Sequence, residues 1–334
     1  MRQFAKKQIL FVHPRKASFI ELDRELLAER WEIVDLYQPG RWSNPFKVAA
    51  AVRGCDGVVG WWASWHTFWP FIFAPLLKKP SLLIVGGFDI ANERDIGYGY
   101  QQGGARKYLS RLIIKRATRL MTNSEYSRSE FLANIGTPRQ LLDVVYHGVP
   151  DRLGRLRQGP RDRLAITVGN VDSANLERKG LRAFVEAAAL LPDVEFVVVG
   201  RLLDDGAERL RELAGPNVKL VGFVSDEELF NLYERAAVYV QASQHEGFGV
   251  SVAEAMLGGC VPVVTRRGAL PEVVGDVGIM LDSREATAIA EGIRTALALD
   301  SQAPTRARER ILVEFPVQKR RSGLQDLVGR LLGV

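Results

Sequence analysis

The chain has 334 residues, of which 47% are hydrophobic and 25% charged, and its net charge is +6. This length predicts two domains or one large barrel, and this composition excludes wholesale disorder and fibrous repeats. Cys55 and Cys260 lie far apart in the sequence and form no C-x-x-C pair. A zinc site or a disulfide framework is therefore not expected. The cysteine content instead favours a reducing, cytoplasmic location.

The positive charge is concentrated in the first half. Residues 1–150 carry 21 Lys and Arg against 13 Asp and Glu, whereas the remaining residues carry 24 against 26. This excess favours an anionic partner, such as a phosphate-bearing substrate or a membrane surface. The alternative is a solvated face that only keeps the protein in solution. The basic residues form no recognised nucleic-acid-binding module, so a nucleic-acid partner is not expected.

Short β-branched runs alternate with amphipathic helical patterns along both halves of the chain. In the first half, strands are predicted at residues 8–12, 31–36, 57–62, 81–85, 119–123 and 143–146, and helices at 20–29, 107–117 and 125–134. In the second half, strands are predicted at residues 165–168, 194–199, 218–220, 238–241, 261–264 and 278–281. This alternation predicts α/β domains with buried parallel strands in doubly wound sheets.

A Gly-, Pro- and Arg-rich stretch without apolar periodicity separates the two halves. We predict a first domain at 1–152, a linker at 153–163, a second domain at 164–315 and a final helix at 316–334. Residues 57–77 carry no formal charge, but they include Pro70, Pro75 and His66. That stretch predicts a strand, a turn and a helix rather than a membrane span.

The most informative segment is H-E-G-F-G-V-S-V-A-E-A-M at residues 245–256, between a predicted strand and a helix. Its glycines allow a ligand to approach the backbone closely. The N–H groups of Gly249, Val250 and Ser251 at the helix start suit a phosphate or a diphosphate. The alternative is a glycine turn that merely caps a helix.

Two glutamates flank this segment. Glu254, about one and a half turns into the helix, is placed to accept hydrogen bonds from two neighbouring hydroxyls of a ribose. Glu246 precedes the helix and is expected to face the other end of the ligand, where a sugar would lie. The alternative for both is a solvated side chain.

The run E-G-F-G-x4-E-A-M, continuing through G-G-C-V-P-V-V to G-A-L-P-E-V-V-G-D, resembles the donor-site signature of the family 4 retaining glycosyltransferases. The resemblance covers residues 168–281, and the first half matches in architecture alone. It implies a GT-B fold: two doubly wound Rossmann-like domains facing each other across a cleft, with a C-terminal helix that crosses back to the first domain. The donor-binding residues that it implies are Gly169, Asn170, Phe223, Val224, Gly247, Phe248, Gly249, Val250, Ser251 and Glu254.

In this family a lysine, and usually an arginine directly after the glycine of a strand, bind the donor phosphates. Lys179 matches the lysine, but Asn170 occupies the arginine position and supplies no positive charge. Either Arg178 or Arg201 takes over, or the phosphate is held less tightly. The segment V-G-F-V-S-D-E-E-L at residues 221–229, which contains Phe223 and Val224, resembles the strand-end turn whose backbone contacts the donor base in the family. The alternative is a purely structural turn in which Ser225 or Asp226 caps the following helix.

The implied catalytic residues are Glu246, Lys179 and Arg178. Breaking the anomeric bond builds negative charge on the departing diphosphate, which oriented amides and Lys179 stabilise. Glu246 is expected to hold sugar hydroxyls in position rather than to act as a nucleophile. No Asp-x-Asp pair is present, so we expect no metal ion and no cofactor other than the nucleotide-sugar co-substrate.

The acceptor side carries fewer signals. Arg15 and Lys16 follow the first strand and either meet an anionic acceptor or lie in a solvated loop. His66 lies near a family histidine, with a structural histidine as the alternative. Asp89 matches the Asp of a His-Asp pair that is frequent in the family, but here the His is absent.

Two other patterns have a purely structural alternative. A basic stripe either contacts anionic lipid or forms the solvent-exposed face of a packed helix. An aromatic cluster either lines an acceptor groove or packs in the core. The stripe consists of Lys107, Arg111, Lys115 and Arg119, and the cluster of Trp61, Trp62, Trp65, Phe68, Trp69, Phe71 and Phe73.

Together these features predict a retaining glycosyltransferase that moves a hexose-type sugar from a UDP- or GDP-linked donor to a glycan, lipid-linked or small-molecule acceptor. The L-P-E-V-V-G-D stretch resembles mannosyltransferase-like members. The protein is expected in the cytoplasm, with peripheral contact with an anionic membrane left open. The alternative is a GT-B nucleotide-sugar-binding protein without transferase activity, because of Asn170 and the missing His. A dinucleotide-dependent oxidoreductase is disfavoured, since no G-x-G-x-x-G follows the first strand.

Overall fold

The computed structural model describes residues 6–41 and 43–334, which divide into two compact units. Unit 1 holds the chain up to Gly148 together with Val317–Val334, and unit 2 is Val149–Pro316. The predicted linker ends too late, because residues 162 and 163 already belong to a strand of unit 2.

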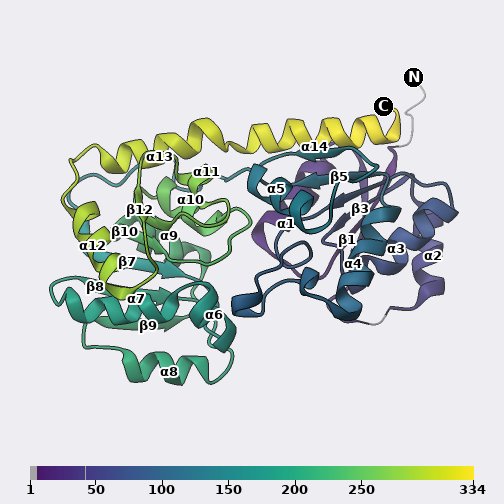
Figure 1. Ribbon diagram of the computed structural model, residues 1–334. Helices are drawn as coiled ribbons and strands as arrows, with labels where there is room; N and C mark the ends of the chain where they lie inside the picture. The colour runs from purple at the N-terminus through teal and green to yellow at the C-terminus, as the bar shows by residue number, and fades with distance from the viewer. Residues whose placement is uncertain (1–5, 42) are drawn as a thin grey trace. The chain divides into compact units, whose positions relative to one another are not determined.

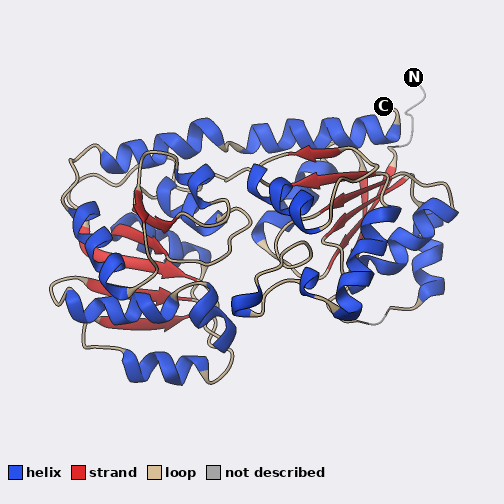
Figure 2. Ribbon diagram, viewed as in Figure 1, coloured by secondary structure: helices blue, strands red, loops and turns tan. Residues whose placement is uncertain are grey.

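Unit 1 is a parallel six-stranded sheet in the order β2-β1-β3-β4-β5-β6, covered by helices (Figures 1 and 2). Its strands are β1 (Gln8–His13), β2 (Glu32–Tyr37), β3 (Gly57–Trp61), β4 (Ser81–Ile84), β5 (Arg119–Thr122) and β6 (Leu142–Val144). Its α-helices are α1 (Ser18–Ala28), α2 (Pro45–Gly54), α3 (Trp65–Leu76), α4 (Gly104–Arg116), α5 (Glu125–Asn134) and α14 (Val317–Leu332).

The middle residues of the central strands of unit 1 are apolar because both faces of the sheet are covered. Along β1, Leu10 and Val12 pack into one core with α2, α3 and α4. The alternate residues Ile9 and Phe11 pack into a second core with α1 and α14. Successive side chains of a strand point to opposite faces, so a continuous apolar run fits this double burial.

The C-terminal helix α14 is anchored to unit 1 by an ion pair from which solvent is excluded. Arg320 donates from Nε to Asp23 Oδ1 (2.8 Å) and from Nη2 to Asp23 Oδ2 (2.6 Å), and both side chains are 1% exposed. Its Nη1 donates to the carbonyl of Val145. Within unit 1, α14 therefore contacts α1 and the segment that follows β6.

Unit 2 is also a parallel six-stranded sheet, in the order β12-β11-β10-β7-β8-β9. Its strands are β7 (Asp162–Val168), β8 (Glu195–Val199), β9 (Val218–Gly222), β10 (Ala236–Gln241), β11 (Val261–Thr265) and β12 (Ile279–Leu281). Its α-helices are α6 (Ser173–Arg178), α7 (Leu181–Ala187), α8 (Gly206–Leu213), α9 (Asp226–Arg235), α10 (Val250–Leu257), α11 (Leu270–Val274), α12 (Ala286–Leu297) and α13 (Ala303–Glu314).

Each predicted strand is present, with ends displaced by at most three residues. The basic stripe is not one helix face, because α4 ends at Arg116 and Arg119 begins β5, where it pairs with Asp143. Arg111 donates to Gln101 and to the carbonyl of Asn134. The core interpretation of the aromatic cluster is confirmed, since its members are buried in the unit 1 cores or packed against them. Among the described residues, no helix is both long and apolar enough to cross a membrane.

Candidate functional site

The candidate site lies within unit 2, at the edge of the sheet where the parallel strands end. Two glycines follow neighbouring strands there, Gly169 after β7 and Gly200 after β8. A Cβ on Gly200 would lie 2.0 Å from the Gly169 carbonyl oxygen, and one on Gly169 would lie 2.6 Å from Cδ of Lys179. The two glycines therefore let the strand ends approach each other and let Lys179 cross the end of β7.

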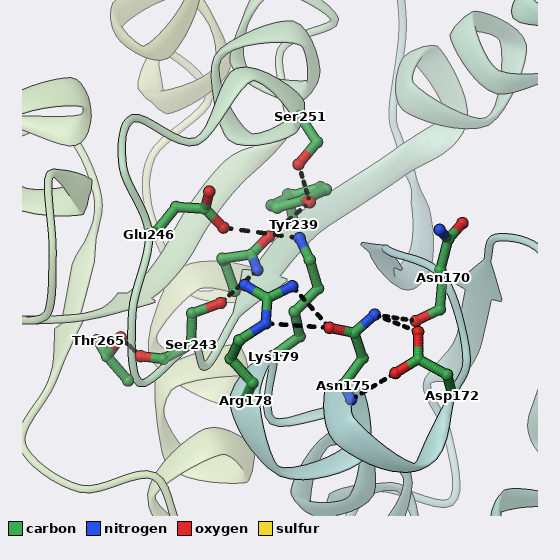
Figure 3. Close-up of polar contacts among 11 residues, drawn as sticks. Asn170, Asp172, Asn175, Arg178, Lys179, Tyr239, Ser243, Glu246, Ser251 and Thr265 are labelled. Atoms are coloured by element: carbon green, nitrogen blue, oxygen red, sulfur yellow. Dashed lines mark hydrogen bonds and ion pairs between the residues drawn. The ribbon is translucent and has the colours of Figure 1, made fainter. Parts of the chain in front are cut away.

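Lys179 and Glu246 form the centre of the site (Figure 3). Nζ of Lys179 lies 3.6 Å from Oε2 of Glu246, and the two side chains are 16% and 19% exposed. Burial raises the pKa of Glu246, but the positive charges of Lys179, Arg178 and His245 outweigh it and lower that pKa overall. Glu246 is therefore an ionised acceptor at neutral pH, suited to bind hydroxyl groups.

Asn175 holds the second cation of the site. Its Oδ1 accepts from Nε (3.1 Å) and Nη2 (2.6 Å) of Arg178, while its Nδ2 donates to the carbonyl of Asn170 and to Asp172 (Figure 3). Arg178 thereby lies close enough to lower the pKa of Glu246. Of the two arginines considered for the missing charge, Arg178 is thus the one beside Glu246.

Arg201 takes a different place. Its guanidinium carbon lies 4.9 Å from the ring centroid of Phe223, whose side chain is 69% exposed. Asn170 is exposed, and its backbone carbonyl accepts a hydrogen bond from Nδ2 of Asn175. The exposed Phe223 ring of the strand-end turn is therefore paired with the exposed Arg201 guanidinium.

The amide cradle at the start of α10 is present. Gly249 takes a left-handed conformation (φ 96°, ψ 55°) as the N-cap, and no side chain caps the helix. The N–H groups that open α10 are thus not used by a capping side chain and carry the positive end of the helix dipole. This geometry suits the diphosphate that the sequence predicts.

A network of hydrogen bonds between side chains of β10 and the residues around it holds the start of this helix. The hydroxyl of Tyr239 lies 2.9 Å from both Gln241 Oε1 and Ser251 Oγ, and Gln241 Nε2 donates to Ser243 Oγ at 2.6 Å (Figure 3). Ser251 is therefore held through the end of β10, which the sequence analysis missed. The signal was available in the alternation along β10, which turns Tyr239 and Gln241 to the same face.

Gly268 fixes the backbone of Glu246. It has φ 62°, and a Cβ there would lie 2.2 Å from the Glu246 carbonyl oxygen, which accepts from Ala269 N at 2.9 Å. Any larger residue at this position would push the Glu246 loop away. The motif contained this glycine, but its role depends on a contact between two loops.

Two of the predicted donor-binding residues, Phe248 and Glu254, are in buried environments. The Phe248 side chain is 3% exposed and packs edge-on against Phe315, with ring centroids 5.2 Å apart, so only its backbone can face a ligand. Gly247 precedes it in the same loop. Burial raises the pKa of Glu254 to about 7, against the opposing effect of Arg152. A hydrogen bond from a ribose hydroxyl would favour the ionised form of this carboxyl group.

The expected acceptor-side residues lie in unit 1 and fall into two groups. Arg15 and Lys16 are exposed after β1. His66 is buried with Nε2 2.6 Å from the Trp61 carbonyl, and burial lowers its pKa to about 4, an environment that suits a structural histidine. Asp89 is fully buried and accepts from Ala63 N (3.0 Å) and Gly86 N (3.1 Å). In this conformation neither His66 nor Asp89 can touch an acceptor directly; Asp89 instead holds the loops after β3 and β4.

Asp89 gives unit 1 a pH dependence that can be measured. Burial raises its pKa from 3.8 to about 7, against the hydrogen bonds from the Ala63 and Gly86 amides. The folded state therefore binds a proton that the unfolded state releases between these values. We expect the unfolding free energy, relative to that of Asp89→Asn, to fall as pH rises from about 4 to about 7, by up to about 4 kcal/mol. Urea unfolding of both proteins across this range measures the difference, and parallel pH profiles would contradict it.

No group of three or more His, Cys, Asp or Glu side chains is arranged to hold a metal ion within the part of the chain that the structure describes. Among the described residues, the charges that act at the candidate site include those of Lys179, Arg178, His245 and Glu246, together with the dipole of α10.

Comparisons with known proteins agree with this arrangement. Residues 162–298 match the model of the family "Glycosyl transferases group 1". The chain is 34% identical over 176 residues to MMP alpha-(1->4)-mannosyltransferase of Mycolicibacterium hassiacum, covering 51% of this chain and 42% of that protein. It is 29% identical over 208 residues to O-antigen chain mannosyltransferase B of Escherichia coli, covering 56% and 54%. The matches thus span about half the length of these curated relatives.

Solved structures match over nearly the whole chain. The Anabaena protein HepE in complex with UDP and glucose has a TM-score of 0.76 at 17% identity, with 97% of this chain and 99% of that chain covered. Sucrose-phosphate synthase of Thermosynechococcus elongatus has a TM-score of 0.78 at 18% identity, with 98% and 100% covered. These likenesses confirm the GT-B fold with two Rossmann-like units. The chain therefore has a GT-B fold, and its residues 162–298 match the model of the glycosyl transferases group 1 family.

Proposed function

We propose that this protein is a retaining, metal-independent glycosyltransferase that moves a hexose-type sugar from a UDP- or GDP-linked donor to a glycan, lipid-linked or small-molecule acceptor. The observation that carries the proposal is the Lys179–Glu246 pair beside the uncapped start of α10. The names of two relatives favour mannose as the sugar.

The chemistry of transfer accounts for each charge in the site. The diphosphate gains negative charge as the anomeric bond breaks, and the α10 amides, Lys179 and Arg178 offset it without reorganising. Since these groups are cations and oriented amides, no divalent ion is needed for the leaving group. Glu246, kept ionised by the same cations, binds hydroxyl groups of the sugar and positions its anomeric carbon.

Donor binding can be tested before any acceptor is known. A thermal-shift screen against UDP-, GDP- and dTDP-sugars is expected to give one donor class that raises Tm by about 5–10 °C at a hundred times its Kd. This shift follows because such an excess stabilises the folded state by about 2.7 kcal/mol, and unit 2 has the size at which 1 kcal/mol moves Tm by about 2–4 °C. The Lys179→Ala protein should lose most of the shift. A flat response of the wild-type protein to every donor would contradict the proposal.

Transfer itself is then followed with the best donor in buffer containing EDTA. Proton NMR of the product reports its anomeric configuration, which should equal that of the donor. An inverted product, or a rate that vanishes in EDTA and returns with Mg²⁺, would contradict the retaining or the metal-independent part of the proposal.

A binding protein without transferase activity is the second candidate. It is favoured by the neutral Asn170 at the position where the family resemblance implies an arginine, and by an Asp89 that is buried rather than presented to an acceptor. Donor binding by calorimetry, combined with neither hydrolysis nor transfer across an acceptor panel, would select this candidate.

A further inference from the structure

The end of β3 in unit 1 holds a strained residue. Trp62 directly follows this strand and has φ 60°, and apart from Lys78 no other non-glycine residue at 6–41 or 43–334 has a positive φ. Its indole Nε1 donates to the Gly86 carbonyl at 2.7 Å, which ties it to the loop after β4. Such a conformation costs about 1–3 kcal/mol and persists where the surroundings enforce it, frequently at ligand-binding sites.

The ring of Trp62 packs against Arg15, which lies two residues beyond the end of β1. The guanidinium carbon of Arg15 lies 4.6 Å from the ring centroid of Trp62 and 6.0 Å from that of Phe19. Because β1 and β3 are parallel neighbours, both residues emerge at the same edge of the sheet. A guanidinium stacked on a ring keeps its N–H donors in a plane, in a fork that matches phosphate and carboxylate groups.

The backbone of Arg15 is fixed as well. Nδ1 of the buried His13 lies 3.0 Å from the Arg15 carbonyl, and its Nε2 lies 2.9 Å from Asp35 Oδ1. These two contacts hold the His13 ring between the Arg15 loop and β2. The loop and the side chain of Arg15 are thus ordered in advance, which lowers the entropy lost on binding.

The electric field around Arg15 favours an anion. Unit 1 carries 25 Lys and Arg against 14 Asp and Glu. Helix α1 carries Glu21, Asp23 and Glu25, and strand β2 carries Glu32 and Asp35; of these, Glu21 pairs with Arg24. Asp23 pairs with Arg320, Asp35 contacts His13, and Asp89 accepts two backbone amides. Lys16 adds a second exposed cation next to Arg15.

We propose that the acceptor of this enzyme carries an oxyanion, a phosphate or a carboxylate, which Arg15 binds on its Trp62 platform. This inference rests on the proposed glycosyltransferase function and adds the chemical class of its acceptor. Paired N–H donors to an oxyanion give both affinity and orientation, so a charged acceptor is selected over its neutral counterpart.

Calorimetry on the full chain tests this proposal, with the donor site first saturated by the nucleoside diphosphate of the preferred donor. Saturation keeps a sugar phosphate out of the candidate donor site. Mannose 1-phosphate and mannuronate are expected to bind at least tenfold more tightly than methyl α-mannoside. Arg15→Gln should abolish this preference, and Arg15→Lys should restore part of it. An isoprenyl phosphate in detergent micelles, against the isoprenyl alcohol, distinguishes a lipid-linked phosphate from a soluble one.

Arg53, exposed in the last turn of α2 and thus at the opposite end of β3, provides the matched control. Arg53→Gln removes the same charge and should keep the tenfold preference. The proposal is overturned if charged and neutral ligands bind equally, if none binds, or if Arg15→Gln keeps the preference. Failure of the nucleoside diphosphate to bind in the first titration would instead count against the donor site and the proposed function.

Discussion

Replacing Lys179 by alanine is expected to lower kcat at least a hundredfold while the protein stays folded. One preorganised donor to the charge that develops in a transition state is worth about 10²–10³ in rate, and Lys179 is the ammonium next to Glu246. Its removal also leaves Glu246 with weaker cationic support, which moves the pKa of that carboxyl upward. The measurement is initial-rate kinetics with the best donor of the thermal-shift screen, with circular dichroism to confirm folding.

The matched control is Lys219→Ala. Lys219 lies on the edge strand β9, pairs with Glu195 and is largely exposed, so its removal should change kcat less than twofold. Glu246→Ala should reproduce the loss seen with Lys179→Ala, since under the proposed function the two side chains bind the same donor. Wild-type kcat in either site variant would contradict the assignment of the site.

The sequence predicted the strands and the amide cradle because both are local features. A buried parallel strand is a continuous apolar run whatever its neighbours are, and a glycine N-cap has no side chain of its own to cap the helix N–H groups. The Lys179–Glu246 contact was not predicted, because the two positions are 67 apart in the sequence and the family resemblance placed each of them in the site separately. The α2 helix had a local signal that went unused: Asn44 accepts from the amides of Phe46 and Lys47, just ahead of Pro45.

What sequence reasoning missed depends on tertiary contacts. The spacing of four residues that joins Lys115 to Arg119 continues past the end of α4, so the apparent stripe crosses from a helix to a strand. The motif predicted Phe248 as a donor-binding residue, yet its side chain is buried and packs against Phe315. Asn175 belongs to no recognised motif. Its hydrogen bonds with Arg178 form because helix α6 places the two residues one turn apart.

Replacing Arg320 by alanine is expected to destabilise unit 1 by about 3–5 kcal/mol. Arg320 and Asp23 are both fully buried, and their two hydrogen bonds hold α14 on α1. The variant leaves the Asp23 carboxylate in an apolar core without its counter-ion, and this unpaired charge dominates the loss. Urea unfolding monitored by circular dichroism measures the change. Arg321→Ala is the control, since Arg321 pairs with Glu29 at the surface and should cost less than about 1 kcal/mol.

The double variant Asp23→Leu/Arg320→Met separates the charge effect from the packing effect. If the loss in Arg320→Ala comes from the unpaired carboxylate, removing both charges while keeping their volume should recover most of the stability. Trp61 supports this substitution, because its ring lies 5.9 Å from the Arg320 guanidinium carbon and can pack against a methionine. A double variant as unstable as Arg320→Ala would instead show that the hydrogen bonds of Arg320, including the one to Val145, hold the helix.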